Sequence, residues 1–424
     1  MNLQPKAAFR QACILPAKPS GMKISVVLDN ELNSDIRVLR EIKLLKENGF
    51  DVSVLCFGFG KKKYEVPVPG ISVERISLRR KVKDTLFFFL NTLPAYEWLW
   101  SSYIRRHIRR INPDFLHVHD LYMARSAHNG ILRSGKKIPL ILDLHENYPF
   151  TVTTYNWTKG FLRNLLSRPE AWKRKEREYL GYADRFIVLS GEYRDSIIEQ
   201  YTELNPENFC VFPNVPDLPQ PADKNGVPAE NPFNSGFPIL LYYGVIAERR
   251  GVFETIEVFT KLIREGYPVN LLFIGPVDRH DRPRFEKAIH DPLLSQNIRH
   301  ISWIDARDFP SYLKISDICL APFHVNPQHE SGVANKVYDY MLGGKPLIVS
   351  ACRPQKNLVE KHECGLVFHD QDEYYRAIIR LAENELLRNT MGANGYMAIR
   401  DHYNIPAMKD HLLSVCYSSF QISK

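Results

Sequence analysis

Short apolar runs alternate along this chain with longer stretches in which apolar residues recur every three or four positions. The short runs predict buried strands, and the longer stretches predict amphipathic helices. The first strand is predicted over Lys23–Leu28, and Ser34 is the predicted N-cap of a helix that Gly49 ends. Further strands are predicted over Asp51–Phe57, Ile71–Ile76, Phe115–His119, Ile138–Leu144 and Arg185–Leu189. Strands separated by helices indicate βαβ units and a parallel sheet.

This rhythm breaks between Pro213 and Pro238, where Pro, Asn, Gly and Ser dominate without a helical or strand period. Such a segment is typical of a linker between domains. After it, strands are predicted over Ile239–Tyr243, Val269–Ile274, Ile298–Trp303, Ile318–Pro322, Pro346–Ser350 and Gly365–Phe368. Each is followed by a loop and a helical stretch, so a second doubly wound sheet is expected. The final stretch, Glu373–Phe420, has helical character and is expected to pack back across the first domain.

The chain length agrees with two α/β domains, because 424 residues, of which 44% are hydrophobic, exceed most single cores. We expect two Rossmann-like domains that face each other across a cleft. The predicted segments are a loose leader over 1–21, a first domain over 22–213, a linker over 214–238, a second domain over 239–400 and a helix over 401–424 that crosses back to the first domain.

Cysteine usage and charge narrow the cellular context. The seven cysteines are scattered singly, without a Cys-x-x-Cys pair or metal-ligand spacing, which is typical of a reduced cytoplasmic protein. The first residues lack the apolar core of a signal peptide. A net charge of +8 suits an anionic membrane surface or phosphate-bearing substrates. No nucleic-acid-binding motif is found, so a nucleic-acid partner is not expected.

The most apolar segment, Thr85–Trp100, is interrupted by Asn91, Pro94 and Glu97 and is too broken to cross a bilayer. It is rich in aromatic residues and lies between basic clusters, which makes it a candidate for peripheral contact with the inner face of the membrane. A pair of core helices with solvated flanks is the alternative, and both interpretations stay open.

In parallel α/β sheets, ligands bind beyond the carboxyl ends of the strands, where helix N-termini offer free amides to anions. The loop after Ile239–Tyr243 begins at Gly244 and carries Arg249 and Arg250, whose guanidinium groups suit a diphosphate leaving group. A solvated, basic helix start is the alternative. Gly275 ends the next strand and permits close approach of a ligand, although a simple turn explains it equally well.

The most specific segment of the chain is Glu330–Pro346. If a helix starts near Val333, the amides just before it face a phosphate. These amides belong to Ser331 and Gly332. Lys336 and Asp339, three positions apart, then share one helical face. The lysine is expected to neutralise phosphate and the carboxylate to accept the hydroxyls of a ribose.

Two strand tips in the first half each carry a histidine next to a carboxylate: His119 with Asp120, and His145 with Glu146. Because the strands are expected to be neighbours, both tips face the same cleft. A structural histidine satisfied by the backbone is the alternative for each. A metal held by the two histidines and a carboxylate lacks any fixed geometry, and no metal is expected. Asp370–Asp372 directly precedes a helix and is interpreted as a cap rather than a metal-binding pair.

The segment Asn335–Met341, followed by Gly343–Pro346, resembles the Asn-Lys-x-x-Glu-Tyr-Met-x-x-Gly-Lys-Pro box of glycosyltransferase family 4. Parts of the first helix, the linker entry and the strand before the box are also similar to that family, from Lys23 to about Phe368. The resemblance implies a GT-B fold, transfer with retention, and a donor held mainly by the C-terminal half. It also implies that His119 lies near the donor sugar and the acceptor hydroxyl.

The sequence departs from the family pattern at three places. The family commonly has two glutamates eight positions apart, where this chain has Ser331 and Asp339, unless Glu330 replaces the first. Val245 stands at the position of the usual arginine, and Arg250 at that of the family's lysine. These departures leave the sugar and the nucleotide open more than the fold.

We therefore predict a glycosyltransferase that moves a sugar from a UDP- or GDP-type donor to a hydroxyl of a glycan or lipid-linked acceptor, without a cofactor. The predicted catalytic residues are His119, Arg250 and Lys336. The predicted donor-binding residues are Gly244, Arg249, Arg250, Gly275, Ser331, Gly332, Asn335, Lys336 and Asp339, and the acceptor-side residues are Asp120, His145 and Glu146. A nucleotide-sugar epimerase of the same fold and a non-catalytic sugar or nucleotide binder are the alternatives.

Overall fold

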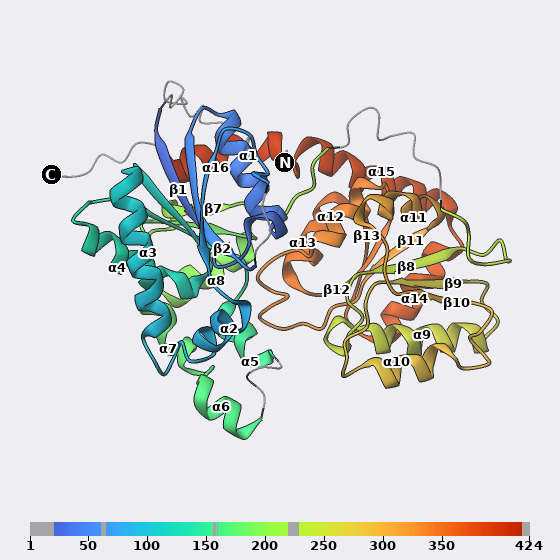
Figure 1. Ribbon diagram of the computed structural model, residues 1–424. Helices are drawn as coiled ribbons and strands as arrows, with labels where there is room; N and C mark the ends of the chain where they lie inside the picture. The colour runs from blue at the N-terminus through green and yellow to red at the C-terminus, as the bar shows by residue number, and fades with distance from the viewer. Residues whose placement is uncertain (1–20, 61–64, 156–157, 159, 219–228, 418–424) are drawn as a thin grey trace.

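The computed structural model describes residues 21–60, 65–155, 158, 160–218 and 229–417. Its strands form two parallel sheets, one in each half of the chain (Figure 1). The first contains β1 (Lys23–Val27), β2 (Asp51–Gly58), β3 (Ser72–Ser77), β4 (Phe115–His119), β5 (Leu140–Leu144), β6 (Arg185–Val188) and β7 (Phe209–Val211). The second contains β8 (Ile239–Tyr243), β9 (Asn270–Ile274), β10 (Ile298–Ile301), β11 (Ile318–Ala321), β12 (Leu347–Ser350) and β13 (Gly365–Phe368).

The strand orders are β3-β2-β1-β4-β5-β6-β7 and β10-β9-β8-β11-β12-β13. The first half contributes α1 (Ile36–Glu47), α2 (Arg80–Phe88), α3 (Ala95–Ile111), α4 (Ala124–Ser134), α5 (Tyr148–Thr154), α6 (Phe161–Ser167), α7 (Ala171–Leu180) and α8 (Gly191–Gln200). The second contributes α9 (Val252–Arg264), α10 (Arg282–Ile289), α11 (Phe309–Ile315), α12 (Asn335–Leu342), α13 (Arg353–His362), α14 (Gln371–Ala382), α15 (Glu385–Asp401) and α16 (Ile405–Tyr417).

Each sheet has a hydrophobic core on both faces. In the first domain, α3, α4 and α7 cover one face, and α1 with α16 covers the other. In the second domain, α12 and α15 pack on one face, and α9 with α14 packs on the other. The strands are therefore buried on both sides, which explains why they read as continuous apolar runs in the sequence. The expected two-domain α/β architecture is confirmed.

Every predicted strand is present, within two residues at either end. The three-residue strand β7 was not predicted, because Phe209–Val211 is too short for an alternating or continuous apolar pattern to stand out. The predicted N-cap Ser34 is wrong. The cap of α1 is Asp35, whose carboxylate accepts a hydrogen bond from the Val38 amide, while Ser34 lies in a preceding 3-10 turn.

Loops at the carboxyl ends of the two sheets contact each other. The Ser190 hydroxyl, which follows β6, donates a hydrogen bond to the Ser331 carbonyl at 3.2 Å. Gly332 lies so close to Leu189 that an added Cβ would be 2.7 Å from the leucine side chain. Ligand-binding edges of parallel sheets are their carboxyl ends, so this contact brings both candidate edges to the same region.

The last helix, α16, packs against β6 and β7 of the first sheet. Tyr417 at its end is buried, and its hydroxyl lies 2.7 Å from Nδ1 of His117 on β4. A helix over the predicted crossing segment therefore contacts the first domain (Figure 1). The predicted boundaries themselves stay predictions, since residues 1–20 of the leader and 219–228 of the linker lie outside the described residues.

The apolar segment Thr85–Trp100 forms the end of α2 and the start of α3. Leu90, Tyr96 and Trp100 are buried in the core of the first domain. The core-helix interpretation therefore accounts for much of this segment. In the part of the chain that the structure describes, no helix has both the length and the apolar character to cross a membrane.

Candidate active site

A half-buried arginine and a buried lysine lie together at the carboxyl edge of the second sheet. Arg250 ends a 3-10 turn after β8, and Lys336 lies in the first turn of α12. The Lys336 Nζ is 3.6 Å from the centroid of the Tyr242 ring, and both cations lie over the Phe323 ring, at 5.1 Å for Lys336 and 5.7 Å for Arg250. Among the described residues, neither the Arg250 Nε nor the Lys336 Nζ has a hydrogen-bond partner.

Burial lowers the pKa values of both groups, and a neighbouring arginine adds to the shift of each. The pKa of Lys336 falls well below its usual value, mainly because of burial and then because of the Arg250 charge. Burial also lowers the pKa of Arg250, and the neighbouring Arg249 adds to this effect. A buried charge without a counter-charge is costly, so this pair would be stabilised by an anion that contacts both groups.

Gly251 fixes the turn that carries the two arginines. Its φ is 70°, and an added Cβ would lie 1.7 Å from the Pro322 carbonyl oxygen. Only glycine fits there without moving the backbone. The two arginines then diverge, because the exposed Arg249 pairs with Asp278 at 3.4 Å while Arg250 turns inward.

Some of the other predicted donor-binding residues have contacts within the protein that account for their residue types. The helix expected near Val333 begins at Asn335, whose side chain is exposed, so the amides of Ser331 and Gly332 lie before the helix rather than at its start. The buried Ser331 hydroxyl donates to the Gln328 carbonyl at 2.6 Å.

Gly275 and Gly244 pack against each other. At Gly275, where φ is 140°, an added Cβ would be 2.2 Å from the Gly244 carbonyl oxygen. The close packing of these two loop backbones, more than access for a ligand, explains why Gly275 has no side chain. The Lys336 Nζ lies close to Gly244, since a Cβ built there would be 3.4 Å away. Gly244, Arg250 and Lys336 are thus brought together.

The carboxylates of Asp339 and Glu330, in and just before the segment Asn335–Met341, have different surroundings. Burial raises the pKa of Asp339 to about 6, although the charge of Arg40 on α1 opposes the shift. Glu330 accepts hydrogen bonds from the backbone amide of Arg353, at 2.7 Å, and from its guanidinium group. Glu330 is therefore engaged with the start of α13.

At the carboxyl edge of the first sheet, an arginine that the sequence analysis missed organises the buried charges. Arg37 of α1 binds Asp143 through two hydrogen bonds of 2.9 Å, from Nε and Nη2. Its Nη1 donates to the Phe212 carbonyl at 2.9 Å and to the Asn214 side chain at 2.8 Å. The arginine thus joins α1, β5 and the segment leaving β7.

The predicted histidines join this cluster from adjacent strands, and His119 on β4 is in register with Asp143 on β5. The fully buried His119 has Nδ1 3.2 Å from Asp143 Oδ2 and 3.0 Å from the His145 Nε2. The His145 Nε2 lies 2.9 Å from Asp143 Oδ2. Burial alone would lower the pKa of His145, but Asp143 and then Asp120 raise it to about 9.

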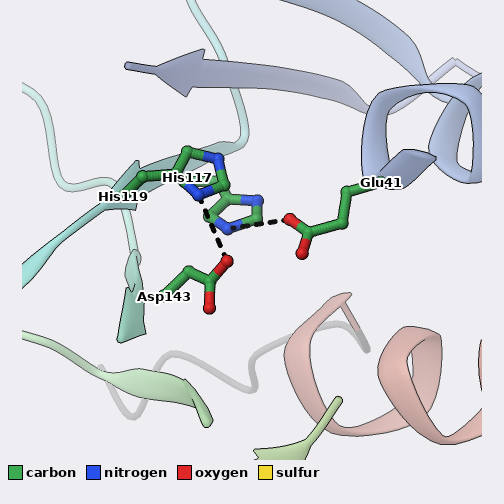
Figure 2. A group of neighbouring side chains, drawn as sticks. All are labelled: Glu41, His117, His119 and Asp143. Carbon is green, nitrogen blue, oxygen red and sulfur yellow. Dashed lines mark hydrogen bonds and ion pairs between the residues drawn. The ribbon is translucent and has the colours of Figure 1, made fainter. Parts of the chain in front are cut away.

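A metal could be considered at this cluster, because Glu41, His117, His119 and Asp143 each offer one ligand atom within 4.8 Å of the others (Figure 2). However, Arg37 already engages both oxygens of Asp143. A divalent cation would have to displace that guanidinium or lie beside it. The donor set therefore fits an internally compensated charge cluster better than a metal centre.

The remaining acceptor-side residues lie around these strand tips. Asp120 has a φ of 72°, which is rare for a residue other than glycine and marks local backbone strain. Burial raises the pKa of Glu146 to about 7, and its Oε1 accepts a hydrogen bond from the Tyr155 hydroxyl at 2.8 Å. Asp29 after β1, which was also missed, has its pKa raised to about 6 by burial.

Two family models match most of the chain. Residues 36–219 match the family described as Glycosyltransferase Family 4. Residues 223–398 match the family described as Glycosyl transferases group 1. The chain belongs to these glycosyltransferases. The resemblance of the chain to family 4 is thereby confirmed, the box Asn335–Met341 lies within the group 1 match, and glycosyl transfer is the activity of this chain.

Individual relatives are distant. This glycosyltransferase is 26% identical to the alpha-D-kanosaminyltransferase of Streptomyces kanamyceticus over 75% of this chain and 80% of that protein. Other curated relatives match over 44% to 61% of their own length. Among solved structures, sucrose-phosphate synthase from Thermosynechococcus elongatus has a TM-score of 0.69 at 17% identity, covering 93% of this chain and 98% of that one. Anabaena Alr3699/HepE in complex with UDP-glucose has a TM-score of 0.64 at 14% identity, covering 93% and 98%. These likenesses show the GT-B fold.

Proposed function

We propose that this glycosyltransferase takes its sugar from a nucleotide diphosphate donor bound at the second domain and transfers it, with retention, to a hydroxyl presented by the first domain. The observation that carries the proposal is the pair Arg250 and Lys336 at the carboxyl edge of a parallel sheet. The buried Arg250 Nε and Lys336 Nζ have no hydrogen-bond partner among the described residues. A diphosphate has the charge and the acceptor oxygens that this pair lacks.

The cations would act mainly when the glycosidic bond of the donor breaks. The bond between the anomeric carbon and the diphosphate oxygen cleaves, its electron pair stays on that oxygen, and the acceptor oxygen bonds to the anomeric carbon as its proton leaves. Negative charge therefore grows on the diphosphate in the transition state. Arg250 and Lys336, held in place by burial against Tyr242 and Phe323, would stabilise it without reorganising solvent.

On the first domain, His119 and His145 would position the sugar and the acceptor. His119 is held by Asp143 and His145, and its buried Nε2 has no hydrogen-bond partner among the described residues. That nitrogen would bind a sugar hydroxyl once a small movement of the loops at this sheet edge exposes it. Asp120 and Glu146, on the same strand tips, would orient the acceptor hydroxyl. Asp339 would accept the ribose hydroxyls, as the family resemblance implies.

UDP is the first nucleotide to test, because a structural neighbour, Anabaena Alr3699/HepE, is described in complex with UDP-glucose. A glycan or lipid-linked acceptor, met at the inner face of the membrane, fits the basic first domain. Another relative is a capsular polysaccharide biosynthesis glycosyltransferase from Staphylococcus aureus, which favours a role in polysaccharide or glycolipid synthesis. The family match favours transfer over the epimerase and the non-catalytic binder.

The decisive experiment is a transfer assay with radiolabelled UDP- and GDP-sugars and a panel of soluble glycans and lipid-linked acceptors. Label should move to an acceptor with release of the nucleotide diphosphate, and the product should keep the anomeric configuration of the donor. Conversion of the donor to an epimer without acceptor would overturn the proposal. So would tight donor binding with neither transfer nor hydrolysis.

A further inference from the structure

One short helix of the first domain exposes most of its apolar side chains. The fractional exposures on α6 are 83% for Phe161, 69% for Leu162, 57% for Leu165 and 44% for Leu166. These are four of its seven residues, and the helix buries Ser167 alone. Single exposed apolar residues are ordinary, but a contiguous group of this size marks an interaction site.

A neighbouring loop extends the apolar group. The Asn91 side-chain amide donates to the carbonyls of Ser167, at 3.0 Å, and Arg168, at 3.1 Å. This contact ties the α2–α3 loop, with Leu93 exposed at 53%, to the end of α6. We call Leu93 and the four exposed apolar residues of α6 the α6 surface. Figure 1 shows α6 at the edge of the first domain, on the side away from α16.

The residues around the α6 surface are strongly basic. Between Phe161 and Lys175 the chain has five basic residues and one acidic residue, Glu170. The basic residues are Arg163, Arg168, Lys173, Arg174 and Lys175. Glu170 is itself paired with Lys173 at 2.7 Å. Apolar side chains that can enter the headgroup region, flanked by an excess of positive charge, complement an anionic lipid surface.

The α6 surface is also connected to the acceptor side of the site. The segment leading to it starts at Glu146 and passes through α5. Tyr155, at the end of α5, donates its hydrogen bond back to the Glu146 carboxylate at 2.8 Å. A membrane held at α6 would therefore lie on the side of the first domain that carries Asp120, His145 and Glu146.

We propose that the α6 surface docks this enzyme on an anionic bilayer, so that a lipid-linked acceptor reaches the first domain from the membrane. The placement of the acceptor rests on the proposed function, whereas the docking itself does not. The element responsible is α6 with Leu93. Of the aromatic segment Thr85–Trp100 that contains this leucine, Leu90, Tyr96 and Trp100 lie in the core.

The test is sedimentation of the full-length protein with vesicles of equal parts phosphatidylglycerol and phosphatidylcholine at low ionic strength. The wild type should bind these vesicles, bind pure phosphatidylcholine vesicles weakly, and dissociate as salt is added. The double variant Phe161→Ser/Leu165→Ser should bind at least about tenfold less tightly, because it loses two side chains that enter the bilayer. Leu386→Ser is the matched control, since Leu386 on α15 is 77% exposed. It should bind like the wild type.

Three results would overturn the docking proposal. The wild type could fail to bind vesicles, or the double variant could bind them as tightly as the wild type. The third is that the wild type self-associates without binding vesicles and that the double variant loses this self-association. Stabilisation by UDP or GDP is measured in the same proteins. If nucleotides stabilise the double variant like the wild type while vesicle binding is lost, docking and donor binding are separate functions. If nucleotides stabilise neither protein, the proposed donor site fails while the docking result still holds.

Discussion

Arg250 and Lys336 of the second domain differ from Arg37 of the first domain in what surrounds them. Arg37 has every side-chain nitrogen engaged, by Asp143, the Phe212 carbonyl and Asn214. Lys336 is buried and Arg250 half-buried, but the Arg250 Nε and the Lys336 Nζ have no hydrogen-bond partner among the described residues. A compensated charge holds a fold together, whereas an uncompensated one costs stability until a ligand arrives. The same residue types thus stabilise the structure of the first domain and, in the proposed function, bind the donor at the second.

The largest expected effect is on catalysis. Arg250→Met and Lys336→Met should each lower the turnover number by about 10²–10³-fold, because each removes a charge that stabilises the leaving group. Neither substitution should lower the melting temperature of the unliganded protein, because each removes a charge whose buried nitrogen has no hydrogen-bond partner among the described residues. Steady-state kinetics and thermal melts check both statements. Arg249→Met, which removes an exposed arginine paired with Asp278, should have a clearly smaller effect on turnover.

The opposite outcome is expected at Arg37. Arg37→Met should destabilise the protein by about 3–5 kcal/mol, because it leaves the Asp143 carboxylate buried without its main counter-charge. Denaturant unfolding gives this value. In the double variant Arg37→Met/Asp143→Leu, the loss should be less than the sum of the two single losses. Additive losses would show that the two side chains are not the coupled pair described above.

More of the fold than of the candidate site could be predicted from the sequence. Strands such as Phe115–His119 are recognisable because burial on both faces gives continuous apolar runs. Lys336 and Arg250 follow strands, so their shared edge was predictable. The Arg37–Asp143 pair spans 106 residues, and no local pattern records such a contact. One sequence signal did point to buried charge on this helix. Glu41 is a charged residue next to the apolar Ile42, and both are buried in α1.

A smaller effect is expected from Asp339. Asp339→Asn should raise the KM for the donor about tenfold, as expected for a lost hydrogen bond to a charged acceptor. Because burial raises the pKa of this carboxyl to about 6, the wild-type KM should also rise as the pH falls through about 6. The variant should lack that pH dependence. Asp372→Asn, at an exposed aspartate on α14, is the control and should retain it.

The smallest effect concerns His145. Its pKa in the folded protein, about 9, lies above its ordinary value of 6.5. The stability from its pairing with Asp143 should therefore be fully present below pH 6.5 and lost as the pH rises through about 9. Melting temperatures across this window should fall less steeply in His145→Gln than in the wild type. The exposed His402→Gln should follow the wild type.

The most direct test of the central claim is the melting temperature as a function of UDP and GDP concentration, for the wild type and for Arg250→Met/Lys336→Met. At a nucleotide concentration about 100 times its Kd, binding stabilises a protein by about 2.7 kcal/mol. The account predicts that at least one nucleotide raises the wild-type melting temperature and that the double variant gains little or nothing at the same concentrations. An equal gain in both proteins would contradict the claim that Arg250 and Lys336 hold the diphosphate.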